Sequence, residues 1–223
     1  MAITFNNSTN AFQTTGSATH TVSFTVNAGD NRLLVVGVAV EEDAPCSTVN
    51  GITYDGVALT KIDSQTYRSG DCGVEQWYLL APNVGTANIV VTWNDSVYDY
   101  VHCHADAYNG VKQQAYEAKN KATGTGTTMT VDVTTLTDNA WVVDIVGNNQ
   151  SVEDMTAGAN QTERTEQAGG CRSNTSDEAL ASFGACTMSW TTVTSRDWGI
   201  VGAAFEAAGA AAPVWIPKVI FIN

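Results

Sequence analysis

Histidine and cysteine are the residue types in this chain whose spacing most directly suggests chemistry. His102 and His104 flank Cys103 in a run of alternating residues. Alternate residues of a strand point to one face, so the two imidazoles share a face and the thiol lies on the other. With His20 as a third ligand they could bind zinc, which needs three or four convergent ligands. We expect sheet histidines with satisfied hydrogen bonds and no metal.

The acidic residues offer two further kinds of site. Glu41-Glu42-Asp43 follows a predicted strand and presents the oxygen ligands that calcium prefers, although a solvated acidic loop is the simpler interpretation. Paired carboxylates also carry out glycoside hydrolysis. The candidates for such a pair are Glu75, Asp144, Glu163 and Glu166. Their separation in space is not readable from the sequence, so we predict no catalytic pair.

Aromatic residues suggest a ligand-binding surface. Glu75 alternates with Trp77 in VEQWYLL, and an acid beside an aromatic ring suits a sugar. Tyr67, Tyr98 and Trp198 lie at strand starts or in loops, where an exposed ring could stack on a ligand. Glu75, Trp77 and Trp198 are therefore our candidate ligand-binding residues. Trp77 fits a hydrophobic core equally well, and core positions are expected for Trp93, Trp141 and Trp190.

Nucleophilic catalysis has no support in the sequence. There is no Gly-x-Ser-x-Gly motif and no acid and serine partner for the histidines. Gly124-Thr125-Gly126-Thr127 is followed by no predicted helix, so it indicates a turn rather than a phosphate-binding loop. We expect a protein that is not an enzyme and has no cofactor.

Four of the five cysteines lie in polar, turn-rich segments or at a strand edge. We predict disulfides Cys46–Cys72 and Cys171–Cys186, with Cys103 as a buried thiol, although four cysteines allow three pairings. Disulfides indicate an oxidising final environment. The first residues show neither the basic region nor the apolar region of a signal peptide. A virion protein released by lysis would reconcile these observations, as would a mature chain whose signal was replaced by Met1.

Short strands must position these residues. The 223 residues include 29 Thr and 25 Val but 7 Leu, and β-branched side chains favour sheets. Strand-like runs recur with turn signals between them, as in β-sandwiches. We expect strands at 20–26, 32–40, 49–54, 57–62, 74–80, 87–93 and 100–108, and at 128–134, 140–147, 159–165, 178–183, 186–192 and 198–206. The prediction is an all-β, antiparallel two-sheet sandwich of jelly-roll type, with a single domain over residues 1–206.

The two halves of the sequence echo each other. Asp30-Asn31 precedes one apolar strand and Asp138-Asn139 precedes another. Trp93 and Trp190 each end a strand, and an acid–aromatic pair follows each after six or seven residues. Coincidence is an even alternative. If the echo is real, two similar β motifs interleave into one two-sheet sandwich.

Charge and the C-terminal residues restrict the partners. With 10 Lys+Arg against 23 Asp+Glu, the net charge is -13, which excludes nucleic acid as a main partner, and no apolar run is long enough to insert into a membrane. Small residues fill 207–212, and an apolar end follows in 213–223. Its large apolar residues are Val214, Trp215, Ile216, Val219, Ile220, Phe221 and Ile222. Such an end aggregates in water, so we expect an extended arm that docks on its own sandwich or on a neighbour.

Several segments together resemble a known module. They are NRLLVVGVAVEE, ITYDGVALTKI, VEQWYLLAPNVGTANIVVTW, TAGANQTERTE and ACTMSWTTVTSRDWGIVGAAFEA. They resemble a jelly-roll-like β-sandwich module that recurs in secreted bacterial surface proteins and in phage structural proteins, and the likeness covers about residues 20–207. Its motifs are not catalytic, so it implies no functional residue. It implies display, adhesion or assembly outside the cytoplasm.

The expected function is that of a non-enzymatic structural or decoration protein of a viral particle, attached through the apolar arm. Its partners would be other virion proteins of the capsid or tail, and other copies of itself. The alternative is a lectin-like carbohydrate- or receptor-binding module of a tail fibre or cell-surface adhesin, which would bind cell-surface glycans. Both readings place the protein in the virion or outside the cell.

Overall fold

The structure is a computed structural model that describes residues 1–14, 17–42, 45–94, 99–150 and 152–209. The predicted arm from Val214 to Ile222, and Tyr98 and Asp43, lie outside the described residues. The described chain consists of antiparallel strands and one short 3₁₀ turn, η1 (Arg68–Gly70), and it contains no α-helix. The all-β prediction is confirmed.

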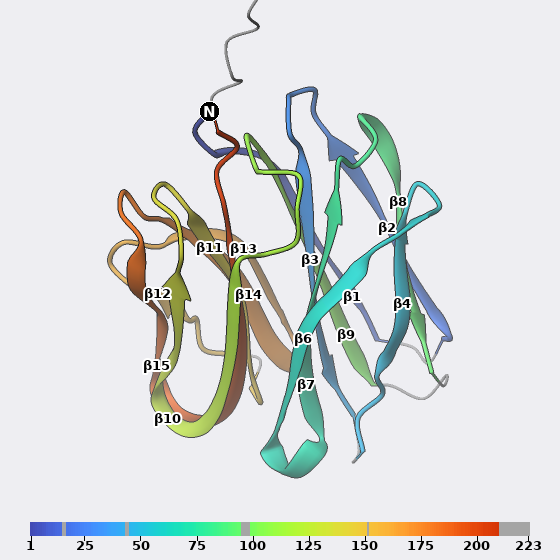
Figure 1. Cartoon of the computed structure of the whole chain (residues 1–223). Helices are drawn as coiled ribbons and strands as arrows, with labels where there is room; N and C mark the ends of the chain where they lie inside the picture. Colours follow the sequence, from blue (N-terminus) through green and yellow to red (C-terminus); the bar gives the residue numbers. More distant parts are fainter. Residues whose placement is uncertain (15–16, 43–44, 95–98, 151, 210–223) are drawn as a thin grey trace, which may run out of the picture.

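Nine strands from the first half of the chain form two sheets (Figure 1). The strands are β1 (Thr4–Gln13), β2 (Thr19–Val26), β3 (Leu33–Glu41), β4 (Val49–Tyr54), β5 (Val57–Ala58), β6 (Thr60–Tyr67), β7 (Cys72–Leu80), β8 (Gly85–Trp93) and β9 (Tyr100–Asn109). The order is β1-β9-β3-β7-β6 in one sheet and β2-β8-β4-β5 in the other. Val36, Phe24 and Trp93 belong to the core between them, which we call the first core.

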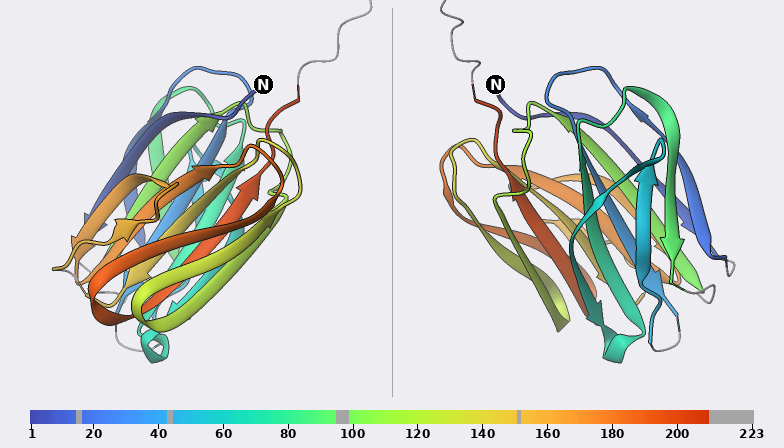
Figure 2. Two further views of the ribbon diagram at one scale, coloured as in Figure 1. Left: turned by 90° about the vertical axis from the view of Figure 1, so that its left-hand side faces the viewer. Right: turned by 45° about the vertical axis from the view of Figure 1, so that its right-hand side comes forward.

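The second half forms one six-stranded sheet that curls back on itself (Figure 2). Its strands are β10 (Ala118–Thr135), β11 (Trp141–Asn148), β12 (Thr156–Ala157), β13 (Thr162–Gly169), β14 (Cys171–Ala179) and β15 (Gly184–Phe205). The long strands β10 and β15 bend together, where their register shifts between Gly126 and Thr128. Met188 and Trp190 before the bend of β15 therefore face Ile200 beyond it across a second core.

The two halves have the same strand order. The sheet order β1-β9-β3-β7-β6 corresponds to β10-β15-β11-β14-β13. Asn31 and Asn139, which precede the equivalent strands β3 and β11, both have positive φ, 52° and 60°. Trp93 and Trp190 lie in the first and second cores. The echo in the sequence therefore corresponds to two similar halves, but the halves do not interleave, because each closes a core of its own.

The five-stranded sheet of the first half packs on the flat part of the second-half sheet. Residues on β3 alternate between this central interface and the first core, so Leu34 and Val36 face one way and Leu33 and Val35 the other. At the centre, a Cβ added to Gly37 would lie 2.6 Å from Cδ1 of Ile145. The two sheets approach this closely because glycine has no side chain there.

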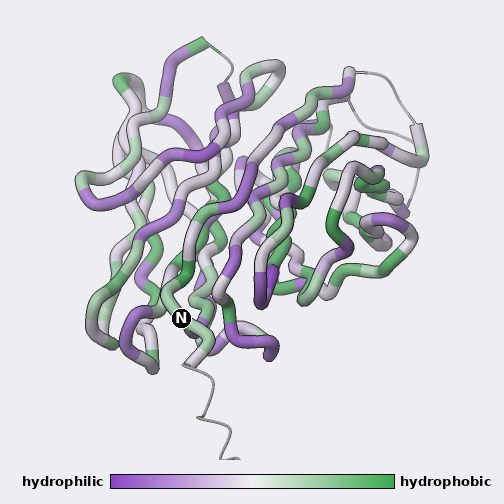
Figure 3. The backbone as a smooth tube through the Cα atoms, turned by 90° about the horizontal axis from the view of Figure 1, so that it is seen from above, coloured by the Kyte–Doolittle hydropathy of each residue, from purple (hydrophilic) through white to green (hydrophobic). Residues whose placement is uncertain are grey.

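The strand pattern explains these layers. On β2, alternate residues are buried: His20, Val22, Phe24 and Val26. Hydrophobic and hydrophilic residues alternate along several strands in the view from above (Figure 3). No helix in the described residues is long and apolar enough to cross a membrane. The fold is consistent with the predicted β-sandwich, but the prediction of two sheets is wrong, because the strands form three antiparallel sheets. The jelly-roll type and the single domain stay predictions.

Candidate functional site

Polar side chains fill one side of the central interface, and we call them the polar seam. They come from three neighbouring strands whose inward-facing residues are hydrophilic. The seam consists of His102, His104, Asp106 and Tyr108 on β9, Ser173, Thr175 and Asp177 on β14, and Arg164 and Thr165 on β13. Alternate residues of β9 and of β14 face each other here because a strand presents every second residue to one face. All but Arg164 are buried.

Both seam histidines have full sets of hydrogen bonds. The nitrogens of His102 lie 2.7 Å from Ser173 Oγ and 2.9 Å from the Gly169 carbonyl oxygen. Those of His104 lie 2.7 Å from Thr165 Oγ1 and 2.7 Å from the same Ser173 oxygen. The prediction of satisfied sheet histidines is confirmed. His20 lies on β2 in the other sheet, and no group of His, Cys, Asp or Glu in the described residues is arranged to hold a metal ion.

An ion pair closes the other end of the seam. Arg164 donates to both carboxylate oxygens of Asp177, at 2.6 and 3.0 Å, and Tyr108 donates to the same carboxylate at 3.0 Å. The Arg164 guanidinium lies 4.0 Å from the centre of the Phe5 ring. A two-pronged pair with a third donor satisfies a buried carboxylate well. Burial raises the pKa of Asp177, and Arg164 and Tyr108 oppose that shift.

Burial keeps the rest of the seam uncharged. It lowers the pKa of His102 to about 4 and that of His104 to about 3. It raises the pKa of Asp106 to about 7, against a hydrogen bond from Thr175 that lowers it. A low-dielectric site disfavours the charged form of any group. Below the raised pKa of Asp106 and above the lowered pKa values of the histidines, the seam therefore holds neutral imidazoles and a protonated Asp106.

The predicted sugar platform is internal. Glu75 accepts hydrogen bonds from Trp77 Nε1 at 3.0 Å and from the Val49 amide at 3.1 Å, and it pairs with Lys61 at 2.9 Å. Glu75 is 6% exposed and Trp77 7%. Trp198 is 8% exposed and belongs to the second core. The expectation that Trp198 is exposed is therefore wrong, as it is for the buried Tyr67.

The four candidate carboxylates are each held by hydrogen bonds or ion pairs to other side chains. Asp144 is buried and accepts hydrogen bonds from Ser176 and from Trp190 Nε1, which lies 2.8 Å away. Glu163 accepts a hydrogen bond from Asn174, and Glu166 pairs with the buried Arg172. Glu75 lies in the other half of the chain. Each carboxylate is thus tied to partners of its own.

The structure contains neither predicted disulfide. All five cysteines are free and buried, and Cys103 is a buried thiol as predicted. Cys46 lies in the first core beside Gly73, whereas Cys72 faces the second half from the opposite side of β7. Cys186 lies 3.7 Å from Met188 in the second core, and Cys171 lies 3.8 Å from His102 in the seam. Cys46 and Cys72 therefore lie on opposite faces of the sheet that contains β7, and Cys171 and Cys186 lie in different clusters, the seam and the second core.

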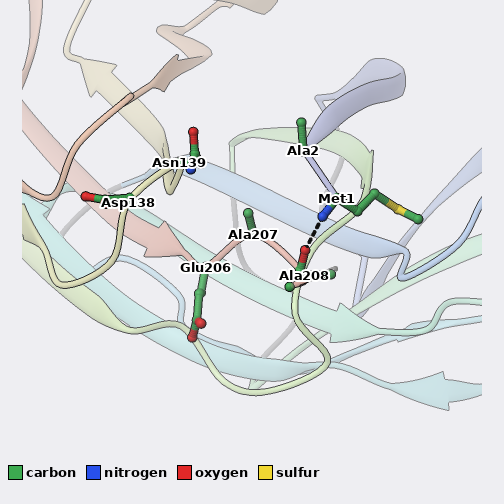
Figure 4. Close-up of a pocket in the computed structure, with 8 residues that line it drawn as sticks. Met1, Ala2, Asp138, Asn139, Glu206, Ala207 and Ala208 are labelled. Carbon is green, nitrogen blue, oxygen red and sulfur yellow. Dashed lines mark hydrogen bonds between the residues drawn. The ribbon is translucent and has the colours of Figure 1, made fainter. Parts of the chain in front are cut away.

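Two hollows lie at the pole where Met1 and Gly209 meet. The Met1 ammonium donates to the Ala208 carbonyl oxygen at 2.6 Å (Figure 4). A hollow of about 470 Å³ lies beside Asp138 and Glu206, and one of about 750 Å³ lies beside Asp30 and Lys112. Their linings include no histidine or cysteine, and we assign no chemistry to them.

Sequence reasoning missed the β14 side of the seam. Residues 171–179 read CRSNTSDEA, which has no apolar alternation, so no strand was predicted between residues 165 and 178. The available signal was the alternation of Ser173, Thr175 and Asp177, which repeats the period of His102 and His104 on β9. That period was visible, but hydrophilic residues normally indicate exposure.

No family model matches this chain, and no curated protein matches it. The recurrence of this module in surface and phage proteins therefore stays a prediction. The proposals below depend on the fold and on its contacts.

Proposed function

We propose that this chain is a non-enzymatic structural or decoration protein of a viral particle, attached through its apolar residues 213–222. The acidic residues and the large apolar residues of the C-terminal segment lie in different parts of the sequence, and this separation supports the proposed function. The last acidic residue is Glu206, whereas 213–222 combine seven large apolar residues with one charge, on Lys218. An acidic body keeps copies apart in solution, while an apolar segment favours burial against a partner.

The observation that carries the proposal is the place where the described chain ends. Gly209 follows Ala208, which is hydrogen-bonded to Met1 at one pole of the body. The described part of the chain therefore ends at this pole, and the apolar segment begins four residues later in the sequence. A particle bound there would leave the outer sheets of both halves exposed, as a decoration protein requires. Capsid or tail proteins and other copies of the chain are the proposed partners.

A substitution series tests this function in the full-length chain. In the arm variant, Trp215, Ile220 and Phe221 are replaced by serine. In the matched control, three exposed apolar residues of the body, Val152, Phe183 and Val193, are replaced by serine. We expect the arm variant to lose co-sedimentation with particles purified from the source, and the control to bind like the original chain. Equal binding by all three proteins, or by none, would overturn the proposal.

The lectin-like alternative stays a second proposal, supported by the resemblance to surface modules. Two of its candidate ligand-binding residues, Trp77 and Trp198, have buried rings, so a glycan site would have to use other residues. The binding series also distinguishes it, because a glycan receptor on the body would leave binding by the arm variant unchanged.

A further inference from the structure

Two large apolar side chains are exposed next to the pole where the described chain ends. Leu136 is 64% exposed and Phe183 is 67% exposed. Leu136 follows Thr135 and Phe183 precedes Gly184, and these two neighbours are the last register pair of β10 and β15 at this end. Large apolar side chains that gather on a surface mark a contact site, whereas single scattered ones do not. We call Leu136 and Phe183 the apolar rim.

The apolar rim borders the hollow of about 470 Å³ at this pole. Asp138 lines the hollow, and its Oδ1 accepts a hydrogen bond from the Phe183 amide at 2.9 Å. The lining also includes Met1, Ala207 and Ala208 (Figure 4). The rim and the hollow therefore form one surface with several apolar side chains and an acidic group between them.

The apolar residues 213–222 are tethered beside this surface. Gly209 itself lines the hollow, and three alanines, residues 210–212, separate it from Pro213. An extended chain spans at most about 3.6 Å per residue, so the chain allows Trp215 to lie no further than roughly 22 Å from Gly209. A short tether of this kind gives an effective concentration on the order of millimolar. The segment can therefore reach the rim without leaving its own pole.

Charge also matches the segment to this hollow. Lys218 carries the one charge within residues 213–222. Asp138 has no ion-pair partner among the described residues, whereas Glu206 pairs with Lys112 at 2.7 Å. The hollow of about 750 Å³ at the same pole has Lys112 in its lining, which repels a second cation. The side of the pole that carries Asp138 therefore fits Lys218 better.

A second copy of the chain is a poorer occupant of the rim than the chain's own segment. Each chain carries a net charge of -13, so two bodies repel each other when they approach. A segment from another copy also lacks the tether that raises the effective concentration. Both the net charge and the short connection therefore favour docking within one chain.

We propose that residues 213–222 of the free chain dock on their own body, over Leu136 and Phe183 and in the hollow beside Asp138. Docking covers large apolar side chains of the segment and of the rim, and it brings Lys218 to an unpaired carboxylate. It shelters a segment that would otherwise favour aggregation. The docked state concerns the free chain and does not rest on the proposed attachment. On a particle, the segment would exchange this surface for that of the partner.

Limited proteolysis of the full chain gives the first test. Trypsin cleaves after Lys218, and the rate of this cut follows the population in which the segment is undocked. In the rim variant, Leu136 and Phe183 are replaced by serine. We expect at least about fivefold faster loss of residues 219–223 in this variant, because two apolar contacts are removed. Both side chains are exposed, so the substitutions leave the cores intact.

The matched control replaces Val152 and Val193 by serine. These residues are 84% and 87% exposed and lie near the bend of β15, at the far end of that strand from Gly184. We expect trypsin to cleave the control at the rate of the original chain. Equal rates in the original chain, the rim variant and the control would overturn the proposal.

Nuclear Overhauser contacts identify the occupant of the rim. In a full chain labelled with carbon-13 at the leucine methyl groups, we expect contacts from Leu136 to the ring protons of Trp215 or Phe221, and their loss in the arm variant. A mixed sample of a labelled, otherwise deuterated chain and an unlabelled chain detects contacts between copies. Contacts in the mixed sample, or in neither sample, would overturn the proposal. Co-sedimentation of the arm variant with particles measures attachment separately, so the two proposals fail by different results.

Discussion

The two sides of the central interface use equivalent strands and opposite chemistry. On one side, β7 packs on the last part of β15 through apolar contacts that include Val74 and Val201. On the other side, β14 packs on β9 through the polar seam. The register pairs place Ser173 at the position of Val74 and His104 at the position of Val201. The same backbone frame therefore accepts either apolar packing or a closed hydrogen-bond network.

The outer ends of the two sides show the contrast most clearly. Ile62, Tyr78 and Phe205 cluster on the apolar side, and Tyr78 and Phe205 have ring centres 6.1 Å apart. The equivalent residues on the polar side are Arg164, Asp177 and Tyr108. Even the irregularities in register recur, since Ile62 and Arg164 are each the extra residue of a bulge. The polar side tolerates burial because each charged group has a partner. Removal of one such partner should therefore destabilise the protein more than a small change in an apolar side chain on the other side.

The largest effect is expected from Asp177→Ala. This substitution leaves the Arg164 guanidinium and the Tyr108 hydroxyl without their acceptor in a buried site. Breaking a buried pair costs about 3–5 kcal/mol, which urea denaturation would measure. Tyr78→Phe, at the equivalent apolar position, should change stability by less than about 0.5 kcal/mol. Similar losses at both positions would remove the contrast between the two sides.

A pH series on Asp106→Asn should show the next largest effect. The pKa of Asp106 is raised from 3.8 to about 7, so its stabilising contribution is complete below pH 3.8 and is lost as the pH rises through 7. The variant lacks this loss. Its stability relative to the original chain should rise by about 1.4 kcal/mol per pH unit between pH 4 and 7. Urea titrations at pH 4, 5 and 6.5 would measure the difference, and parallel profiles would show that Asp106 is charged in the folded chain.

The histidines give a pH dependence of the opposite sign. Their folded pKa values are lowered to about 4 and 3, so their contribution is complete above pH 6.5 and is lost as the pH falls. In Asp106→Asn, the stability that is lost as the pH falls is no longer offset by the stabilising protonation of the Asp106 carboxyl group. The apolar side contains no such groups, so a variant there should keep the profile of the original chain.

Gly37→Ala tests the centre of the interface, where both sides meet. The added Cβ would lie 2.6 Å from Cδ1 of Ile145, so the sheets or the isoleucine must move. Overpacking of this kind costs about 1–3 kcal/mol. Ile145→Val removes the obstructing methyl group, and the double variant should recover most of the loss in urea denaturation. If the double variant is as unstable as Gly37→Ala alone, the loss of stability comes from the backbone around Gly37 and not from the contact with Ile145.

The smallest effect is expected from Tyr108→Phe. It reproduces the residue at the equivalent position of the apolar side, Phe205, and removes the hydrogen bond to Asp177. Because Arg164 still pairs with Asp177, the cost should be about 1 kcal/mol. Thermal unfolding would detect it as a small decrease in Tm, and an unchanged Tm would show that the tyrosine hydroxyl contributes nothing to the seam.

Much of the fold could be predicted from the sequence, and less of the site. Strands β2 and β8 follow the apolar alternation, whereas β3 and β11 follow continuous apolar runs. The hydrophilic strands β1 and β14 were missed, because their residues are polar whether they are buried or exposed. Trp198 was placed at the exposed start of a strand, because the bend of β15, which is continuous over Gly184–Phe205, is not visible as a pattern.

The sequence by itself determined the all-β class, most of the strands and the sharing of one face by His102 and His104, and it suggested two similar halves. These properties are local, because they depend on periods of two residues and on turn signals. Only the tertiary structure decided that the halves pack through one buried interface, and that Ser173 lies between the histidines. Residues 69 positions apart meet there because two sheets stack, and a hydroxyl or a carboxyl acquires its protonation state from such partners rather than from its neighbours in the chain.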